Sequence, residues 1–189
     1  MKAGPALVPV MAVCWLEGGR VSALQPTCLQ PRHRAYTGFM VWGTISYDSR
    51  KTIVVIPRTL TANWYISLVI QPVVLPFMNS IQGCVCQQDN ARPHTAVVTQ
   101  HALRSFNMLT WPARSPNLSP IEHVWDIIGR QLECHPQPAL TVPVLIDQVQ
   151  QAWNSIPQTD IWHLYDTMHA RLHACILNSG GYIYIYIYI

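Results

Sequence analysis

This 189-residue chain is poor in charge, since only 11% of its residues are charged while 50% are apolar. Its 12 lysines and arginines exceed its 9 acidic residues by three, and they form no dense basic run. This balance permits nucleic-acid binding but does not require it. The high apolar content argues against an intrinsically disordered tail, and the length is typical of one domain with its own core.

The cysteine pattern lacks the pairs that mark metal or disulfide frameworks. Six cysteines occur without a Cys-x-x-Cys pair or a regular spacing. Neither a zinc finger nor a disulfide framework is therefore indicated. The apolar run at residues 3–16 is broken by Pro5 and Pro9 and is too short to span a membrane. The same run keeps a secreted protein as an alternative, which predicts cleavage near Ala23 and paired cysteines.

Hydrophobic periodicity predicts strands alternating with helices. The expected order is strand, strand, helix, strand, helix, strand and then three helices. The predicted elements are strands 39–46 and 51–57, a helix from Thr59 or Thr61, a strand ending at Asp89, a helix over 95–106, a strand at 108–111, and helices 119–133, 142–156 and 160–177. This order predicts an α/β fold with a mixed sheet flanked by helices and a helical C-terminal extension.

The last eight residues, 182–189, repeat Tyr-Ile four times. Such alternation of aromatic and β-branched residues is typical of an aggregation-prone strand. A (TA) dinucleotide repeat read in frame encodes the same peptide. We therefore interpret residues 179–189 as a low-complexity tail.

Two acidic residues stand where separate elements begin or end. Asp89 follows a short apolar strand, and Glu122 lies in the first turn of a helix after a proline-rich loop. Carboxylates from two elements suit a divalent metal ion, which prefers oxygen ligands. The alternatives are a Ser-x-x-Glu capping box from Ser119 to Glu122 and a turn-forming role for Asp89. Asp126, one helical turn after Glu122, is a further acid on that face.

Several basic residues near these acids are candidate DNA contacts. The histidines that flank the acids suit phosphate binding or tuning of a ligand, and arginines suit phosphate contacts. Ordinary loop histidines and surface arginines are the alternative reading. The candidates are Arg92, His94, Arg114, His123 and Arg130.

Two motifs carry a resemblance to a known family. They are Gln-Asp-Asn-Ala-Arg-Pro-His at 88–94 and Ser-Pro-Asn-Leu-Ser-Pro-Ile-Glu-His-Val-Trp at 115–125. With Met-Val-Trp-Gly at 40–43, they make the chain resemble the catalytic domain of Tc/mariner superfamily DDE transposases over roughly residues 26–133. The resemblance implies an RNase H-like fold, a nuclear location, and DNA partners, namely transposon ends and TA target sites. It also allows for a homodimer.

The resemblance implies metal-dependent DNA cleavage and strand transfer. In the family, three carboxylates hold two Mg²⁺ or Mn²⁺ ions, which activate water or a DNA 3′-hydroxyl for attack on a phosphodiester. Asp89 matches the second carboxylate and Glu122 the third, with 32 residues between them. Asn117 stands where the family usually has Asp.

The first carboxylate of the family has no counterpart at its usual place. Only Glu17 and Asp48 precede Asp89 among the acids, and neither lies in a matching motif. We expect residues 7–15 to replace the missing first strand, with no acid at the metal site. We also expect the family's amino-terminal helix-turn-helix region to be absent.

We therefore interpret the chain as a truncated, inactive copy. Its expected organisation is a divergent segment at 1–25, a DDE transposase domain at 26–133, C-terminal helices at 134–178 and the tail at 179–189. The alternative is a non-catalytic nucleic-acid-binding or interaction module that retains the fold.

Overall fold

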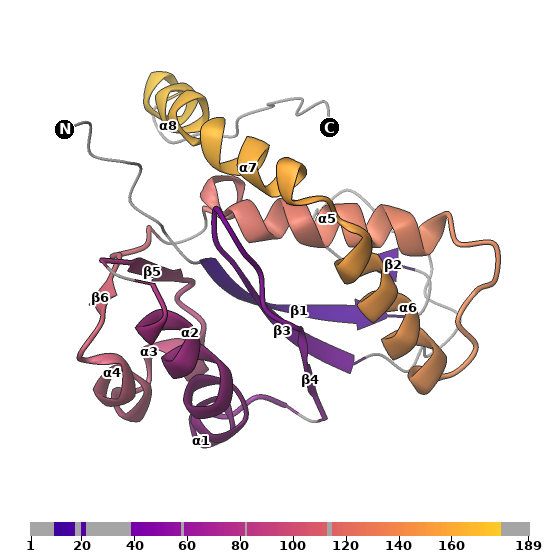
Figure 1. The fold of residues 1–189 in the computed structure, drawn as a ribbon, viewed down its shortest axis with the longest axis horizontal. Coiled ribbons are helices and arrows are strands. Elements are labelled where there is room, and N and C mark those ends of the chain that lie inside the picture. Colours follow the sequence, from indigo (N-terminus) through magenta and orange to yellow (C-terminus); the bar gives the residue numbers. More distant parts are fainter. Residues whose placement is uncertain are drawn as a thin grey trace.

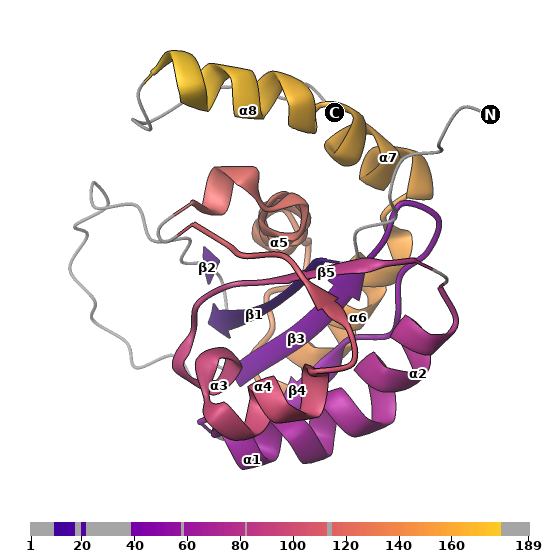
Figure 2. The same ribbon diagram turned by 90° about the vertical axis from the view of Figure 1, so that its left-hand side faces the viewer.

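The structure, a computed structural model, describes residues 10–17, 20–21, 39–57, 59–81, 83–112 and 115–178. A β-sheet lies between two groups of helices, as Figures 1 and 2 show. The Tyr-Ile repeat and Arg114 fall outside the described residues, so the expectations for them stay predictions. In the described part of the chain, none of the helices combines the length and the hydropathy that a membrane span requires.

The sheet is mixed, with an N-terminal strand at its centre. The strands are β1 (Val10–Glu17), β2 (Arg20–Val21), β3 (Phe39–Ile45), β4 (Val54–Ile56), β5 (Val85–Gln88) and β6 (Asn107–Met108). Their order is β4-β3-β1-β5-β6, and β2 pairs with β1. Because β1 runs antiparallel to β3 and parallel to β5, it fills the central place. A strand therefore does occupy the place of the expected first strand. It is described over 10–17, and residues 7–9 of the predicted stretch 7–15 lie outside the described residues.

The central part of β3 sends alternate side chains into two cores. Val41 and Ile45 join the core formed with the helices on one face, whereas Trp42 joins the core on the other. Gly43 faces the first core, where an added Cβ would lie 2.9 Å from Cη2 of Trp153. Glycine at this position lets the tryptophans of that core pack directly on the strand backbone.

The helices on one face follow β4 and β5. They are α1 (Ala62–Tyr65), the π-helical η1 (Ile66–Val74), α2 (Leu75–Asn79), α3 (Arg92–Thr95) and α4 (Val97–Leu103). Thr61 caps α1 by accepting a hydrogen bond from the Trp64 amide, as the sequence predicts. The predicted start at Thr95 is wrong, since the helix begins at Arg92 with Pro93 in its first turn and breaks at Ala96. Proline favours a helix start because its missing N–H is not needed there.

The other face carries the C-terminal helices. A short 3₁₀ turn, η2 (Pro116–Leu118), leads into α5 (Pro120–Glu133), α6 (Val142–Ser155), α7 (Gln158–Asp166) and α8 (Met168–Leu177). The predicted single helix over 160–177 is thus divided at Thr167. The mixed α/β fold with a helical C-terminal extension is confirmed.

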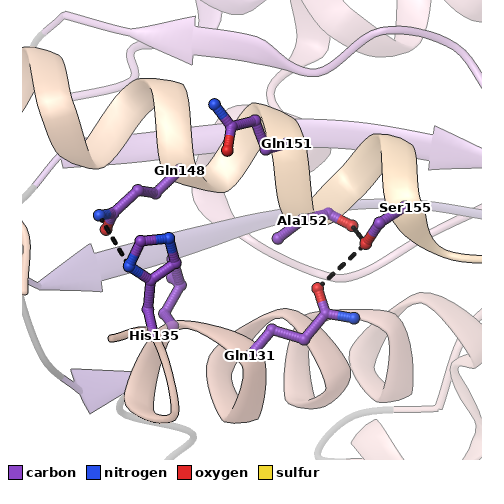
Figure 3. Close-up of a pocket in the computed structure, with 7 residues that line it drawn as sticks. Gln131, His135, Gln148, Gln151, Ala152 and Ser155 are labelled. Carbon is purple, nitrogen blue, oxygen red and sulfur yellow. Dashed lines mark hydrogen bonds between the residues drawn. The ribbon is translucent and has the colours of Figure 1, made fainter. Parts of the chain in front are cut away.

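Helices α5 and α6 pack through aromatic and polar contacts. The rings of Trp125 and Trp153 stack with their centroids 5.4 Å apart. Figure 3 shows the polar edge of this interface, where Gln148 bonds to the His135 ring and the Ser155 hydroxyl bonds to the Gln131 side chain. Helices α6 and α7 therefore share a core with α5, the helix that carries Glu122.

Candidate metal and nucleic-acid site

Asp89 is an anchored carboxylate at the carboxyl end of β5. Its Oδ1 accepts a hydrogen bond of 3.0 Å from the Ala91 amide and pairs with Nδ1 of His94. The side chain nevertheless stays 47% exposed. Asp89 is thus held in place through one oxygen while part of the carboxylate faces solvent, where it can meet a cation.

His94 belongs to the interior of the site. Its side chain is buried, and its ring packs against the ring of Tyr65 with centroids 4.6 Å apart. The Tyr65 hydroxyl donates to Gln88 Oε1 at 3.3 Å, and Gln88 Nε2 donates to the His94 carbonyl at 3.4 Å. This network fixes the ring that binds Asp89, so His94 orients the carboxylate and presents no open surface of its own.

The electrostatics of Asp89 keep it ionised. Burial raises the pKa of its carboxyl, but the hydrogen bond and the Coulombic attraction from His94 outweigh burial, and the Ala91 amide adds to them. The pKa of Asp89 therefore lies below its ordinary value. A permanently ionised, positioned carboxylate is the state that a metal ion requires.

Glu122 lies in the first turn of α5, and its carboxylate is not used as a helix cap. Ser119 is the N-cap residue but makes no side-chain capping bond; only its carbonyl accepts from the Glu122 amide, at 3.2 Å. The capping-box alternative is therefore wrong. The Glu122 carboxylate is left available for another role.

The two predicted acids come together in the structure. Burial, followed by the charges of Asp89 and Asp126, raises the pKa of Glu122 to about 7. Burial also raises the pKa of Asp126, while Arg130 opposes that rise. Like charges near a partly buried carboxylate favour its protonated form unless a cation compensates them. The charge distribution around Glu122 therefore fits a bound cation.

The register of β1 shows which residue stands level with Asp89. Met11 pairs with Gln88, so the next residues along the two parallel strands are Ala12 and Asp89. Glu17 lies five residues beyond Ala12, roughly 17 Å along an extended strand. Within the described residues, no group of three His, Cys, Asp or Glu side chains could hold a metal ion. That β1 brings no acid to the site stays a prediction, and the register places Ala12 at the level where Asp89 follows β5.

The predicted DNA-contact residues differ in their exposure to solvent. Arg92 on α3 and Arg130 on α5 are exposed. Among the described side chains, His94 and Asp89 form the only ion pair within 4.0 Å, so neither arginine forms a salt bridge there, although the charge of Arg130 acts on Asp126. They are free to meet phosphate, and their role in DNA binding stays a prediction.

The charge of the buried Arg171 acts on His123, the residue after Glu122. Burial, followed by the charge of Arg171, lowers the pKa of His123 to about 4, so its ring is neutral at pH 7. Arg171 on α8 is 1% exposed; its Nη1 donates to the Asn117 carbonyl at 3.5 Å and its Nη2 to the Thr167 hydroxyl at 3.1 Å. Sequence reasoning missed Arg171. The one available signal was that no other lysine or arginine follows Arg130.

Comparisons with known proteins relate the chain to transposases. No protein-family model matches it. The Tcb1 transposase of Caenorhabditis briggsae is 33% identical over 147 residues, which cover 76% of this chain and 52% of that protein. The chain thus spans about half the length of this curated relative.

Solved structures show the same fold. The catalytic domain of the Mos1 mariner transposase matches with a TM-score of 0.72 at 16% identity, over 94% of this chain and 84% of that one. The Mos1 mariner paired end complex with Mn matches with a TM-score of 0.77 at 18% identity, over 94% of this chain and 56% of that one. The predicted RNase H-like fold is confirmed by these matches. Together with the curated relative, they show that the chain contains a Tc/mariner superfamily transposase domain.

Proposed function

We propose that this chain is the DNA-handling core of a transposase, with Asp89 and Glu122 as the remnant of its metal site. The grouping of carboxylates carries the proposal: the charges of Asp89 and Asp126 both act on the half-buried Glu122 carboxyl and, together with burial as the larger cause, raise its pKa to about 7. Such a concentration of negative charge stabilises a fold only when a cation offsets it. The relatives with this fold are transposases, and one Mos1 structure contains Mn.

The residues present suit a hard divalent cation. Asp89 and Glu122 would hold Mg²⁺ or Mn²⁺, which when bound polarises a phosphodiester and activates an oxygen nucleophile. Asp89 supplies its free oxygen while His94 and the Ala91 amide hold the other. The exposed arginines Arg92 and Arg130 supply positive charge for the phosphates of a bound DNA end. A nuclear location follows from such a substrate.

We further propose that the chain binds DNA without cleaving it. Ala12 stands level with Asp89 in the central strand, and Mg²⁺ needs near-ideal octahedral coordination. Two carboxylates without a third hold such an ion poorly. In this proposal the chain acts as a non-catalytic nucleic-acid-binding module. It retains the fold that transposases use for strand transfer.

The Ala12→Asp variant tests the proposal. The added carboxylate stands at the level of Asp89, so we expect Mn²⁺ to bind at least about tenfold more tightly, measured by titration calorimetry. A Cys14→Asp variant is the matched control, because it puts the same charge two residues further along β1. Circular dichroism verifies that both variants fold.

The outcomes are distinct. Tighter Mn²⁺ binding in Ala12→Asp, lost again when Asp89→Asn is added, supports a metal site of this composition. Metal-dependent nicking of a supercoiled plasmid by Ala12→Asp would extend the support to catalysis. Equal Mn²⁺ affinity in the wild type, Ala12→Asp and Cys14→Asp chains would refute the metal role of Asp89.

A further inference from the structure

A second feature adjoins the candidate metal site. A cavity of about 360 Å³ opens beside Asp89. The residues that line it belong to β5 and the loop after it, α3, α4, and the chain around β6. Figure 1 shows α3, α4 and β6 close together at the β6 end of the sheet. Asp89 lines the cavity, and Glu122 does not. Its volume falls within the range of small-molecule sites, roughly 300–1,000 Å³.

One wall of the cavity is apolar and partly aromatic. Phe106 and Trp111 contribute half-buried rings, and Leu109 is 44% exposed. Two hydrogen bonds fix this wall: the Leu109 amide donates to the Cys86 carbonyl at 2.7 Å, and Asn90 Nδ2 donates to the Trp111 carbonyl at 2.9 Å. The apolar surface is therefore positioned by the backbone before any ligand arrives.

The remaining lining is polar. Asp89 presents hydrogen-bond acceptors, while Gln100 and Arg104 reach the cavity from α4 and the residue after it. Arg104 is exposed and makes no ion pair among the described side chains. A lining that combines aromatic rings with amide and carboxylate groups and an exposed guanidinium suits a planar ring with a polar edge and an attached phosphate.

We propose that this cavity binds an unpaired nucleobase of the DNA held at the candidate site. A base stacks on the rings of Trp111 and Phe106 and directs its amino or amide edge toward Asp89 and Gln100, while Arg104 meets its phosphate. Because Asp89 serves both the metal site and the cavity, a phosphate near the two carboxylates brings the adjoining nucleotide to the cavity mouth. The inference rests on the proposed function.

The test uses hairpin DNAs that differ in one nucleotide. One hairpin is blunt, one carries a single unpaired 3′ adenine, one carries an abasic 3′ residue, and one has a single-adenine bulge within the stem. Fluorescence anisotropy at low salt measures their affinities for the full chain. Stacking of one base contributes about 1–3 kcal/mol, so we expect the 3′-adenine hairpin to bind about 5- to 150-fold more tightly than the abasic one. A preference for the bulge instead assigns the cavity to a base extruded from a duplex.

Variants locate the effect. Trp111→Ala should remove the difference between adenine and abasic hairpins while leaving the affinity for blunt DNA unchanged. Trp162→Ala is the matched control, since Trp162 is 39% exposed on α7 and stacks on Tyr47 at 6.1 Å. Arg104→Gln, at an exposed position, covers the case in which Trp111→Ala does not fold. It should weaken binding of dAMP more than binding of deoxyadenosine.

The results separate this inference from the proposed function. Absence of binding to every hairpin refutes the DNA-handling proposal, whereas saturable dAMP binding that Trp111→Ala abolishes still upholds the base pocket. Equal affinity for adenine, bulged and abasic hairpins in the wild-type chain overturns the inference. An equal loss for all hairpins in Trp111→Ala overturns it as well.

Discussion

Replacement of Glu122 by Gln should stabilise the metal-free protein at alkaline pH and not at acidic pH. In the folded chain, burial and the charges of Asp89 and Asp126 raise the pKa of Glu122 from 4.5 to about 7. The unfolded chain therefore releases this proton at lower pH than the folded chain does. The wild-type protein is fully stabilised by this group below pH 4.5 and loses that stability as the pH rises to 7.

The magnitude follows from the two pKa values. At 1.36 kcal/mol per pH unit, the loss between pH 4.5 and pH 7 amounts to about 3 kcal/mol. Glutamine has no proton to release, so Glu122→Gln should not show this loss. For a chain of this size, a gain of that order at pH 8 raises Tm by roughly 6–12 °C relative to the wild type.

Thermal unfolding in EDTA at pH 4 and pH 8 provides the measurement. Glu133→Gln is the matched control, because Glu133 is exposed at the opposite end of α5. Saturating Mg²⁺ should raise the Tm of the wild type at pH 8 more than that of Glu122→Gln, since a ligand that binds the folded state stabilises it. A Tm difference between Glu122→Gln and the wild type that is equal at both pH values would refute the reasoning, because burial beside Asp89 would then not destabilise the ionised carboxylate.

Three further predictions follow from single contacts. Asp89→Asn removes one of the charges that raise the pKa of Glu122, so ¹³C NMR titration should find that pKa below about 7; an unchanged value would show that the two groups do not interact. Asn117→Asp adds a negative charge to the residue whose backbone carbonyl accepts from the buried Arg171 guanidinium, so urea unfolding should show a gain of about 1 kcal/mol that disappears, or changes sign, in an Arg171→Met background. Gly43→Ala pushes a methyl group to 2.9 Å from a tryptophan ring, which should cost roughly 1–3 kcal/mol; a neutral result in the same assay would show that the ring moves freely.

Local signals in the sequence were enough for most of the elements and for the two acids. The apolar run at 39–46 predicts β3 as a buried strand, and helices α5 and α6 begin after Ser119 and Thr141, close to where their patterns predict. Asp89 and Glu122 stand in contiguous motifs, so their place at a strand end and a helix start was predictable. These features depend on neighbours within a few residues, which a sequence pattern records directly.

Other features depend on which segments meet, and only the tertiary structure decides them. The central position of β1, and with it the placement of Ala12 level with Asp89, comes from strand register between residues more than 70 positions apart. From the sequence, His94 is a candidate for phosphate binding or for tuning a ligand. In the structure its ring is buried against Tyr65 and bonds to Asp89.

The electrostatics of the site and the shape of the cavity also depend on contacts between segments that are distant in the sequence. Arg171 acts on His123 only because α8 folds back over η2, and the cavity beside Asp89 exists only because the chain after β6 lies opposite α4. The sequence by itself determined the elements, the two carboxylates and the family resemblance. Burial, strand register and the distance between charges all arise from packing between segments that are far apart in the sequence. For that physical reason, only the tertiary structure decides the pKa of Glu122 and the neighbours of Asp89.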